Sequence, residues 1–263
     1  MWIAFVRRGR LDARPRARFP LSEATAGGAE ALCLRGVARL GLCVIAFAVA
    51  TALAANDAAA QTPAVRIHAI QGAGATVVRT DRVAVDAIVI GDFQGAEQLQ
   101  GFFLEEEDVD QDLDPATSEG IFIDCGACPV DVAVGDRVVV HGHPLEHEGM
   151  SRMRAVDAGD VGIVERGKPL PTAALLVLGV PFDSAASHER LEGMLVAHRG
   201  PLHVAEAFEL DRFGQLVLSE TRSFQYTQRM PPSVAGFAAH RDAVRRARIV
   251  LDDDDDLQDA PLV

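Results

Sequence analysis

Five short apolar segments, separated by turns rich in glycine and aspartate, lie within residues 83–156. Their apolar side chains alternate with polar ones or run through valine and isoleucine, which is typical of β-strands. Gly142 and Gly149 permit sharp bends between them. The spacing therefore predicts a small Greek-key barrel, with a flat sandwich as the alternative. The predicted strands are Val83–Ile90, Gly101–Leu104, Gly120–Asp124, Asp136–His143 and Ser151–Val156.

A less regular block follows a predicted linker at Gly167–Pro171. It contains two segments with strand character, Leu191–His198 and Gly214–Ser219. An alanine- and arginine-rich stretch predicts a helix over Ala235–Arg248, and Ile249–Leu251 predicts another strand. We expect a mainly β fold, with a small OB-like Greek-key barrel followed by a second, partly complete α+β or β segment. The expected domains are a leader at 1–60, the OB-fold-like β module at 65–165 and a truncated β-rich segment at 172–263.

The N-terminal region has the composition of an export signal. Leu40–Ala55 is sixteen residues without a charge, and Arg35 and Arg39 precede it. A basic flank, an apolar stretch and small residues form the pattern of a secretory signal peptide. We therefore expect a secreted or periplasmic protein that has no membrane contact after cleavage. A retained single-helix anchor is the alternative, although about 20 apolar residues are needed to span a bilayer.

The formal net charge of −13 hides a division along the chain. Residues 1–39 hold eight arginines and three acidic residues, whereas residues 61–263 hold 17 basic and 34 acidic residues. Because phosphate binding needs clustered Lys and Arg, so acidic a body is a poor general binder of nucleic acid. Arg152 and Arg154, on one face of the fifth predicted strand, are the best cationic pair for weak binding of DNA or RNA.

Cys125 and Cys128 form a Cys-Gly-Ala-Cys motif in a predicted loop between strands. In an oxidising compartment, a local disulfide that closes this loop is the simplest expectation. Free thiols and a metal or redox role are the alternatives. A zinc site needs about four ligands, and the sequence has no second motif of this kind.

An acidic stretch between the second and third predicted strands has the spacing of a calcium loop. Asp108, Asp110 and Asp112 fall at positions 1, 3 and 5 of a twelve-residue loop, and Glu119 falls at position 12. Leu113 occupies position 6, where the sharp turn favours glycine, and strands flank the loop in place of helices. A calcium loop between strands and a solvated acidic loop remain open. The candidate ligands for Ca²⁺, or another divalent cation, are Asp108, Asp110, Asp112, Asp114 and Glu119.

Three histidines form a second metal candidate near the fourth predicted strand. His141 and His143 share one face of that strand, and His147 lies in the turn that follows. Histidines at the surface of a hairpin are the default interpretation. Phe93, Phe102, Phe103 and Phe122 alternate with apolar neighbours, and we expect them in the core.

Several motifs in a fixed order extend over most of the chain from Ile67 to Asp256. They include Ile90-Gly91-Asp92-Phe93-Gln94, Val134-Gly135-Asp136-Arg137-Val138, Leu191-Glu192-Gly193-Met194 and Asp211-Arg212-Phe213-Gly214-Gln215-Leu216. Together they resemble the N-terminal region of secreted bacterial endonucleases of the ExeM/NucH type. The resemblance implies an OB-fold module with a connecting segment, and a nuclease domain of the endonuclease/exonuclease/phosphatase fold as a separate or missing partner.

The residues for phosphodiester cleavage are missing from the sequence. That nuclease fold needs carboxylates for a divalent metal, an Asp-His pair and asparagines, and the single asparagine here is Asn56, in the leader. We therefore expect no catalytic residue. The expected function is a non-catalytic accessory region that positions nucleic acid. The alternative is a calcium-stabilised secreted interaction module that binds no nucleic acid.

Overall fold

The computed structural model describes residues 64–179 and 189–253. The export signal expected within 1–60 lies outside these ranges, as do Asp254–Asp256 of the C-terminal acidic run. In the part of the chain that is described, no helix is long and apolar enough to cross a membrane.

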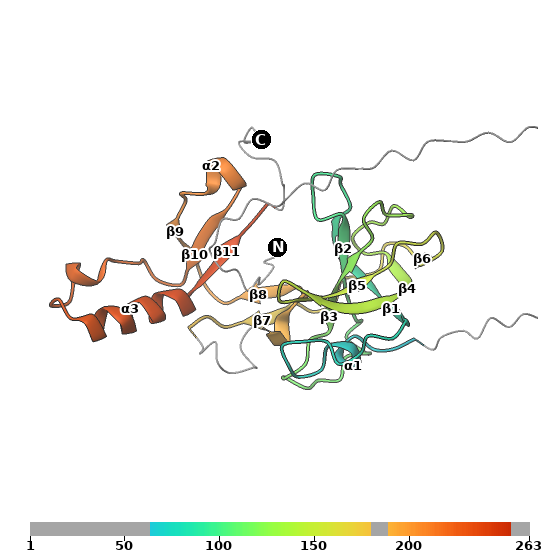
Figure 1. Ribbon diagram of the computed structural model, residues 1–263, viewed down its shortest axis with the longest axis horizontal. Helices are drawn as coiled ribbons and strands as arrows, with labels where there is room; N and C mark the ends of the chain where they lie inside the picture. The colour runs from blue at the N-terminus through green and yellow to red at the C-terminus, as the bar shows by residue number, and fades with distance from the viewer. Residues whose placement is uncertain (1–63, 180–188, 254–263) are drawn as a thin grey trace, which may run out of the picture. The chain divides into compact units, whose positions relative to one another are not determined.

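Five strands close into a barrel (Figure 1). Their order is β1-β2-β3-β5-β4, and β1 pairs again with β4 to complete the ring. β3 and β5 run parallel, and the other barrel pairs are antiparallel. The predicted OB-like Greek-key barrel is thus confirmed, and the sandwich alternative is wrong. The strands are β1 (Val83–Phe93), β2 (Gly101–Glu105), β3 (Gly120–Asp124), β4 (Arg137–His147) and β5 (Met150–Arg154).

The two longest strands close the barrel because each bends and serves two neighbours. β1 pairs with β4 through residues 83–88 and with β2 through residues 88–93, with a register shift between Val89 and Gly91. β4 changes partner from β1 to β5 after Gly142. A Cβ atom on Gly142 would lie 2.5 Å from the carbonyl oxygen of Arg154, so this close approach requires glycine. The bend expected at Gly142 is therefore present.

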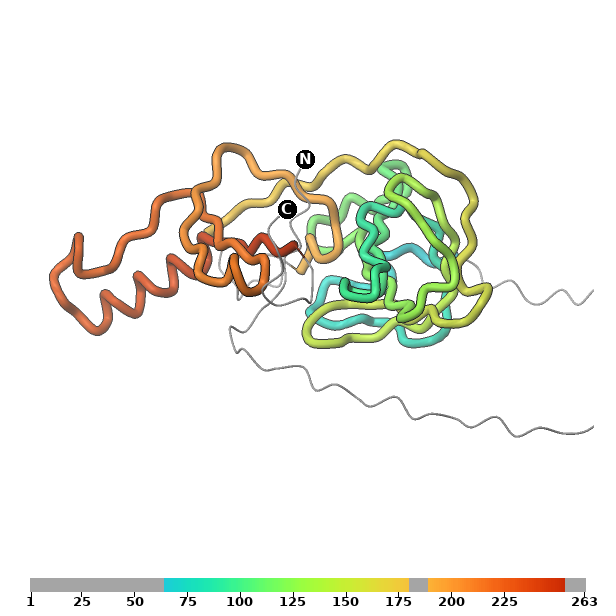
Figure 2. Tube along the Cα trace, turned by 90° about the horizontal axis from the view of Figure 1, so that it is seen from above, coloured from blue at the N-terminus to red at the C-terminus, as the bar shows by residue number. Residues whose placement is uncertain are grey.

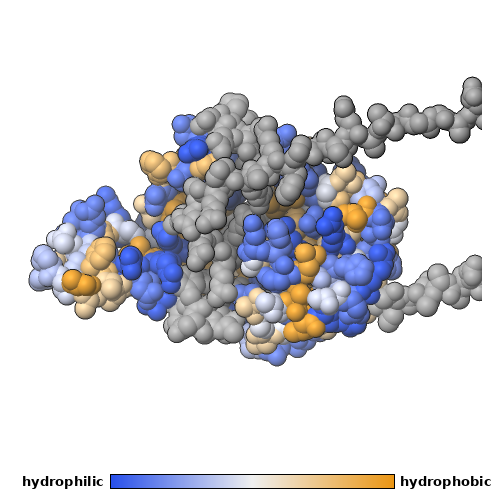
Figure 3. Space-filling model, in the orientation of Figure 1, coloured by the Kyte–Doolittle hydropathy of each residue, from blue (hydrophilic) through white to orange (hydrophobic). Residues whose placement is uncertain are grey.

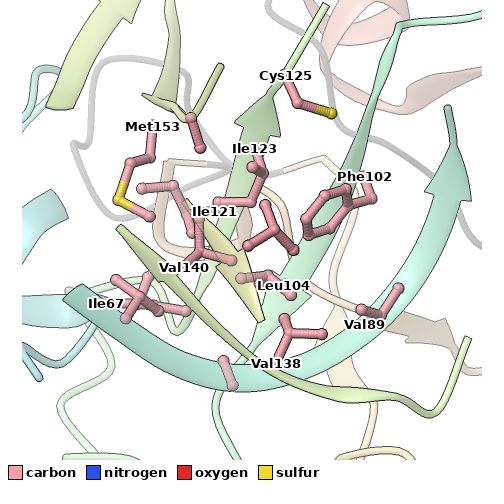
Figure 4. Close-up of a cluster of buried hydrophobic side chains, with 14 of the residues drawn as sticks. Ile67, Val89, Phe102, Leu104, Ile121, Ile123, Cys125, Val138, Val140 and Met153 are labelled. Atoms are coloured by element: carbon pink, nitrogen blue, oxygen red, sulfur yellow. The ribbon is translucent and has the colours of Figure 1, made fainter. Parts of the chain in front are cut away.

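The barrel interior is filled by apolar side chains from every strand (Figure 4). Phe102 and Leu104 of β2 point inward with Ile121 and Ile123 of β3, and all four are fully buried. Each such side chain contributes about 1.5–3 kcal/mol relative to an exposed position. Phe103 and Phe122 lie on the other face of the same strands and are also buried, in a separate cluster.

Apart from α1, which precedes β1, the remaining elements follow the barrel along the chain (Figure 2). β6 extends the barrel sheet beside β4, β7 and β8 form a parallel pair, and β9, β10 and β11 form a three-stranded antiparallel sheet. The predicted helix over Ala235–Arg248 and the strand after it are confirmed as α3 and β11. These elements are α1 (His68–Gln71), β6 (Val161–Glu165), β7 (Ala174–Leu176), η1 (Glu189–Leu191), β8 (Val196–His198), β9 (His203–Glu206), α2 (Leu210–Phe213), β10 (Leu216–Ser219), η2 (Tyr226–Gln228), α3 (Val234–Arg246) and β11 (Arg248–Leu251).

The single strand predicted over Leu191–His198 is wrong in its first half. η1 ends at Leu191, a turn follows, and β8 begins only at Val196. Gly193, in the turn, has a φ of 70°, a left-handed conformation that breaks an extended strand. This turn packs against the barrel, where Ser118 Oγ donates a hydrogen bond to the carbonyl oxygen of Glu192 (2.6 Å).

The predicted linker is attached to the barrel. The Lys168 N–H donates to the carbonyl oxygen of Gly135 (2.7 Å), and its ammonium lies 3.1 Å from a carboxylate oxygen of Glu107. Leu170 packs beside Phe103 and Phe122. The segment from 168 onward therefore continues the barrel's own packing.

Candidate metal centre

Three side chains from distant parts of the sequence converge at one end of β2 and β3. His68 Nδ1 lies 3.0 Å from Glu119 Oε2 and 3.3 Å from Glu106 Oε2. One potential ligand atom from each residue lies within 4.8 Å of the others. Within residues 64–179 and 189–253, this is the one group of three or more His, Cys, Asp or Glu side chains that meets this spacing.

The strand register explains why the two carboxylates meet. Glu105 of β2 pairs with Gly120 of β3, so the residues just outside this pair, Glu106 and Glu119, face each other across the ladder. The Glu106 N–H donates to the carbonyl oxygen of Glu119 (3.1 Å). Extending the ladder by this bond places both side chains at the same edge.

The short helix α1 supplies the histidine. Ile67 and Ile70 flank His68 and are fully buried in the barrel core, which fixes the helix against the barrel. The Ile67 N–H donates to Glu106 Oε1 (2.7 Å). This hydrogen bond holds the Glu106 carboxylate through Oε1, and the other oxygen, Oε2, faces His68.

Two buried carboxyl groups lie next to each other in this cluster. Glu106 is 1% exposed and Glu119 is 5% exposed. Glu106 Oε2 is buried and accepts no hydrogen bond from the described residues. Burial raises the pKa of Glu106 well above its usual range, and the neighbouring Glu119 carboxyl group raises it further. Buried carboxylates of this kind need a proton or a cation between them.

The ligand types favour a transition-metal ion over calcium. An imidazole nitrogen with two carboxylate oxygens is a donor set that suits Zn²⁺ and its neighbours, whereas Ca²⁺ prefers six to eight oxygens. Asp112 Oδ2 lies 3.9 Å from His68 Nε2, on the opposite side of the imidazole ring from the Nδ1 atom that faces the two glutamates. His68 is half-buried, so the site is accessible from solvent.

The acidic residues predicted as calcium ligands have mostly separate partners. Asp108 accepts hydrogen bonds from the N–H (2.7 Å) and the hydroxyl (2.6 Å) of Thr172, which hold its pKa below the usual range. Asp110 pairs with Arg66 (2.5 Å), and Asp114 accepts from the Ala116 N–H (2.9 Å).

Two of the predicted ligands do approach the histidine. Glu119 belongs to the cluster, and its Oε1 accepts the Asp112 N–H (3.0 Å), so Asp112 is tied to the same edge. Leu113 has a φ of 60°, the left-handed conformation that position 6 of a calcium loop requires. Calcium binding at this loop stays a prediction.

The sequence prediction missed His68 and Glu106. Glu106 lies inside the acidic stretch between the second and third predicted strands. Pairing these two strands would have placed it opposite Glu119. His68 lies 51 residues from Glu119 in the sequence. Nothing in the local pattern around His68 indicates that α1 packs beside this loop.

The arginines predicted to bind nucleic acid differ in their surroundings. The Arg152 side chain is 12% exposed, with its guanidinium 5.5 Å from the centre of the Phe122 ring and 4.0 Å from Asp124. Arg154, two residues on, is exposed. The structure therefore leaves one of the two arginines open to a ligand and packs the other between β3 and β5.

The chain's own second segment covers an outer face of the barrel. Phe103 of β2 and Phe122 of β3 have ring centroids 4.8 Å apart and are 1–2% exposed. Leu195, Leu170 and Ala173 pack on them. In OB folds, the face around β2 and β3 holds oligonucleotides, so the aromatic platform that such a ligand would need is occupied here.

Two further predicted sites were the Cys125–Cys128 disulfide and the histidine cluster of β4. Cys125 and Cys128 form a disulfide, and Cys125 is buried in the barrel core. The cluster of His141, His143 and His147 belongs to no group of three potential ligands among the described residues.

Comparison with known proteins gives this chain no family. No protein-family model matches it, and neither a curated protein nor a solved structure does.

Proposed function

We propose that this chain is a non-catalytic accessory module whose barrel is stabilised by a divalent cation held by His68, Glu106 and Glu119. The observation that supports the proposal is the second carboxylate oxygen of Glu106, which is buried, accepts no hydrogen bond from the described residues and faces His68. A cation there would join α1, the end of β2 and the start of β3. Because it binds only the folded state, saturation to 100 times Kd would add about 2.7 kcal/mol of stability.

The module is proposed to act outside the cytoplasm. The Cys125–Cys128 disulfide supports an oxidising compartment. The basic and apolar pattern of residues 35–55 supports export through a signal peptide, and hence a secreted or periplasmic location. Residues 64–263 contain no asparagine, which supports a role without phosphodiester cleavage.

Thermal unfolding with added metal tests the proposed cation. The purified chain is treated with a chelator, dialysed and melted with Zn²⁺, Mn²⁺ or Ca²⁺. We expect Zn²⁺ to raise Tm by several degrees and Ca²⁺ to raise it less. The His68→Ala variant should lose the Zn²⁺ response, whereas His147→Ala, which removes an exposed histidine of β4, should keep it.

Two results would overturn this assignment. An unchanged Tm with every metal would remove the cation from the proposal. A response to Ca²⁺ that survives His68→Ala and disappears in Asp110→Asn would move the cation to the acidic loop, as the alternative function from the sequence requires.

A second candidate function is the positioning of nucleic acid. The strand order and the parallel β3–β5 pair are those of a fold that commonly binds oligonucleotides, and the ExeM/NucH resemblance points the same way. The covered faces of Phe103 and Phe122 mean that such a ligand would use another surface. Gel-shift assays with single-stranded DNA at low salt test this function, and the absence of any shift would contradict it.

A further inference from the structure

Among the residues that the structure describes, α3 and η2 carry a basic surface in an otherwise acidic chain. Residues 222–248 contain six arginines and one acidic residue, Asp242. Residues 61–263 as a whole contain twice as many acidic as basic residues. The positive charge is therefore confined to this part of the acidic chain. It includes α3, a helix in which no residue is buried.

A groove of about 730 Å³ separates α3 from the segment that contains η2. Tyr226 of η2 holds the two walls together, because its ring lies 6.2 Å from that of Phe237 and 5.7 Å from that of His240. His240 Nε2 also lies 3.0 Å from the carbonyl oxygen of Phe224. The walls are thus fixed in the folded chain. The groove is lined by, among others, Phe224, Phe237, His240, Arg241, Arg245 and Arg248.

Two of these arginines, Arg241 and Arg248, are available to an anionic ligand. Arg245 and Arg246 share Asp242, at 3.7 Å and 3.0 Å. Arg241 and Arg248 have no ionic partner within the described ranges, and Arg241 is exposed. A positive charge left without a protein partner beside a groove is a site for phosphate oxygens.

An arginine–aromatic stack adds to this surface at the η2 end. The guanidinium of Arg229 lies 3.6 Å from the centre of the Phe224 ring, and that of Arg222 lies 5.9 Å from it. Stacking on a ring restricts a guanidinium while leaving its in-plane N–H groups able to donate to phosphate. Both arginines are exposed.

Apolar surface lies beside the charge on α3 (Figure 3). Phe237 is 51% exposed and Val234 is 90% exposed. Phe237 and Arg241 are four residues apart, so they are neighbours on one face of the helix. An exposed ring next to an arginine offers stacking for a base and a donor for the adjoining phosphate.

Asp252, the first acidic residue of the C-terminal run, has a partner outside the groove. Asp252 follows Arg248 by four residues along β11, a separation of roughly 13 Å. Its side chain accepts a hydrogen bond from Gln215 (2.6 Å).

We propose that the groove between α3 and η2 binds single-stranded nucleic acid. Arg229, Arg241 and Arg248 contact phosphates, and Phe237 stacks on a base. The assignment rests on the nucleic-acid-positioning function proposed above and gives it a surface other than the covered β2–β3 face. An acidic peptide would satisfy the arginines and leave Phe237 without a matching group, so the combination of ring and charge favours nucleic acid.

Fluorescence anisotropy with a labelled twelve-nucleotide oligo(dT) tests the groove in the purified chain. We expect weak binding at 20 mM salt that falls with ionic strength, with a slope of log K against log salt of about −2 for three phosphate contacts. The variant Arg229→Gln/Arg241→Gln should bind at least about ten-fold more weakly. The control Arg79→Gln/Arg199→Gln removes the same charge outside the groove, from a partly exposed arginine that pairs with Asp81 and from an exposed one, and should bind as the unmodified chain does.

The variant Phe237→Ala separates nucleic acid from other polyanions. It should weaken oligo(dT) binding about five-fold or more, because one stacked base is lost, and it should leave binding of poly-L-glutamate unchanged. Circular dichroism and Tm show whether each variant is folded. Phe237→Leu, which keeps the apolar contact with Tyr226, replaces the alanine variant if that one unfolds.

The oligo(dT) and poly-L-glutamate measurements distinguish three further outcomes. If the unmodified chain binds no oligo(dT) at low salt, the groove assignment and the nucleic-acid function both fail. If it binds, but the groove and control variants bind equally well, the groove assignment fails alone. If poly-L-glutamate competes as well as oligo(dT) and Phe237→Ala has no effect, the groove is a surface for an acidic protein, and our assignment is overturned.

Discussion

Gly120 of β3 and Gly193 of the turn before β8 lie backbone against backbone, so that a Cβ atom on Gly120 would overlap the main chain of Gly193. Hydrogen bonds lie on both sides of this contact. Ser118 Oγ donates to the carbonyl oxygen of Glu192 (2.6 Å), and Glu105 Oε2 accepts the Leu195 N–H (2.7 Å). The second segment therefore docks on the barrel through main-chain contacts that leave no room for a side chain.

The variant Gly120→Ala tests this docking. The added methyl group has to displace backbone, which cannot yield as a flexible side chain does, so we expect a loss of about 1–3 kcal/mol in the free energy of unfolding. Urea denaturation measures it. Gly74→Ala is the matched control, because a Cβ atom there meets nothing within 4 Å. Equal stability of the two variants would show that the segments do not meet as described.

Glu192 makes stability depend on pH. Burial raises the pKa of Glu192 from 4.5 to about 8, while its Oε2 accepts the Ser151 N–H (3.1 Å). Between these two values the folded chain binds more protons than the unfolded chain, so the free energy of unfolding falls as pH rises. The stability that the protonated carboxyl gives at low pH is thus lost as pH rises towards 8.

The variant Glu192→Gln isolates this effect, because glutamine still accepts a hydrogen bond and does not ionise. We expect it to be more stable than the unmodified chain at pH 8 by up to about 4 kcal/mol, since the pKa moves from 4.5 to about 8 and each unit corresponds to ~1.4 kcal/mol, and similar to it at pH 4.5. Denaturation curves from pH 4.5 to 8.5 measure the difference. Glu97→Gln, at an exposed position, should reproduce the pH profile of the unmodified chain. A Glu192→Gln profile parallel to that of the control would disprove the assignment.

Leu113 carries backbone strain in the acidic loop. Its φ is 60° and its side chain is 84% exposed, so it adopts a left-handed conformation without gaining burial. This conformation costs a residue with a Cβ atom about 1–2 kcal/mol in the folded state. Glycine removes that cost, but it also makes the unfolded chain more flexible, which offsets part of the stabilisation. We expect Leu113→Gly to raise the free energy of unfolding by about 0.5–1 kcal/mol. Leu113→Ala retains the Cβ atom, and stabilisation by both variants would point to a cause other than backbone strain.

The barrel was predictable because its strands carry strong local signals. The third predicted strand coincides with β3, and the glycine at 142 correctly marks the change of partner in β4. β6 and β7 were missed. They are short, and Val164 and Leu175 remain exposed, so no alternation of buried and exposed residues distinguishes them from loop. The Leu191–Met194 stretch has strand composition, and its turn is dictated by contact with β3.

The His68, Glu106 and Glu119 cluster was predictable only in part, because its residues are brought together by strand register. Glu119 belongs to a recognisable acidic spacing, and Glu106 follows once β2 and β3 are paired. His68 depends on the packing of Ile67 and Ile70 into the barrel, which no local pattern specifies. Asp108 and Asp110 fit positions 1 and 3 of a calcium loop, yet the structure gives the carboxylates of both, and that of Asp114, separate partners.

Equilibrium dialysis against Zn²⁺, followed by metal analysis of the protein, tests the proposed cation site most directly. We predict one zinc ion per unmodified chain and per His147→Ala control, and far less than one in His68→Ala and in Glu119→Gln. An unmodified chain that retains no zinc, or a full equivalent retained by both cluster variants, would contradict the assignment of His68, Glu106 and Glu119 as a metal centre.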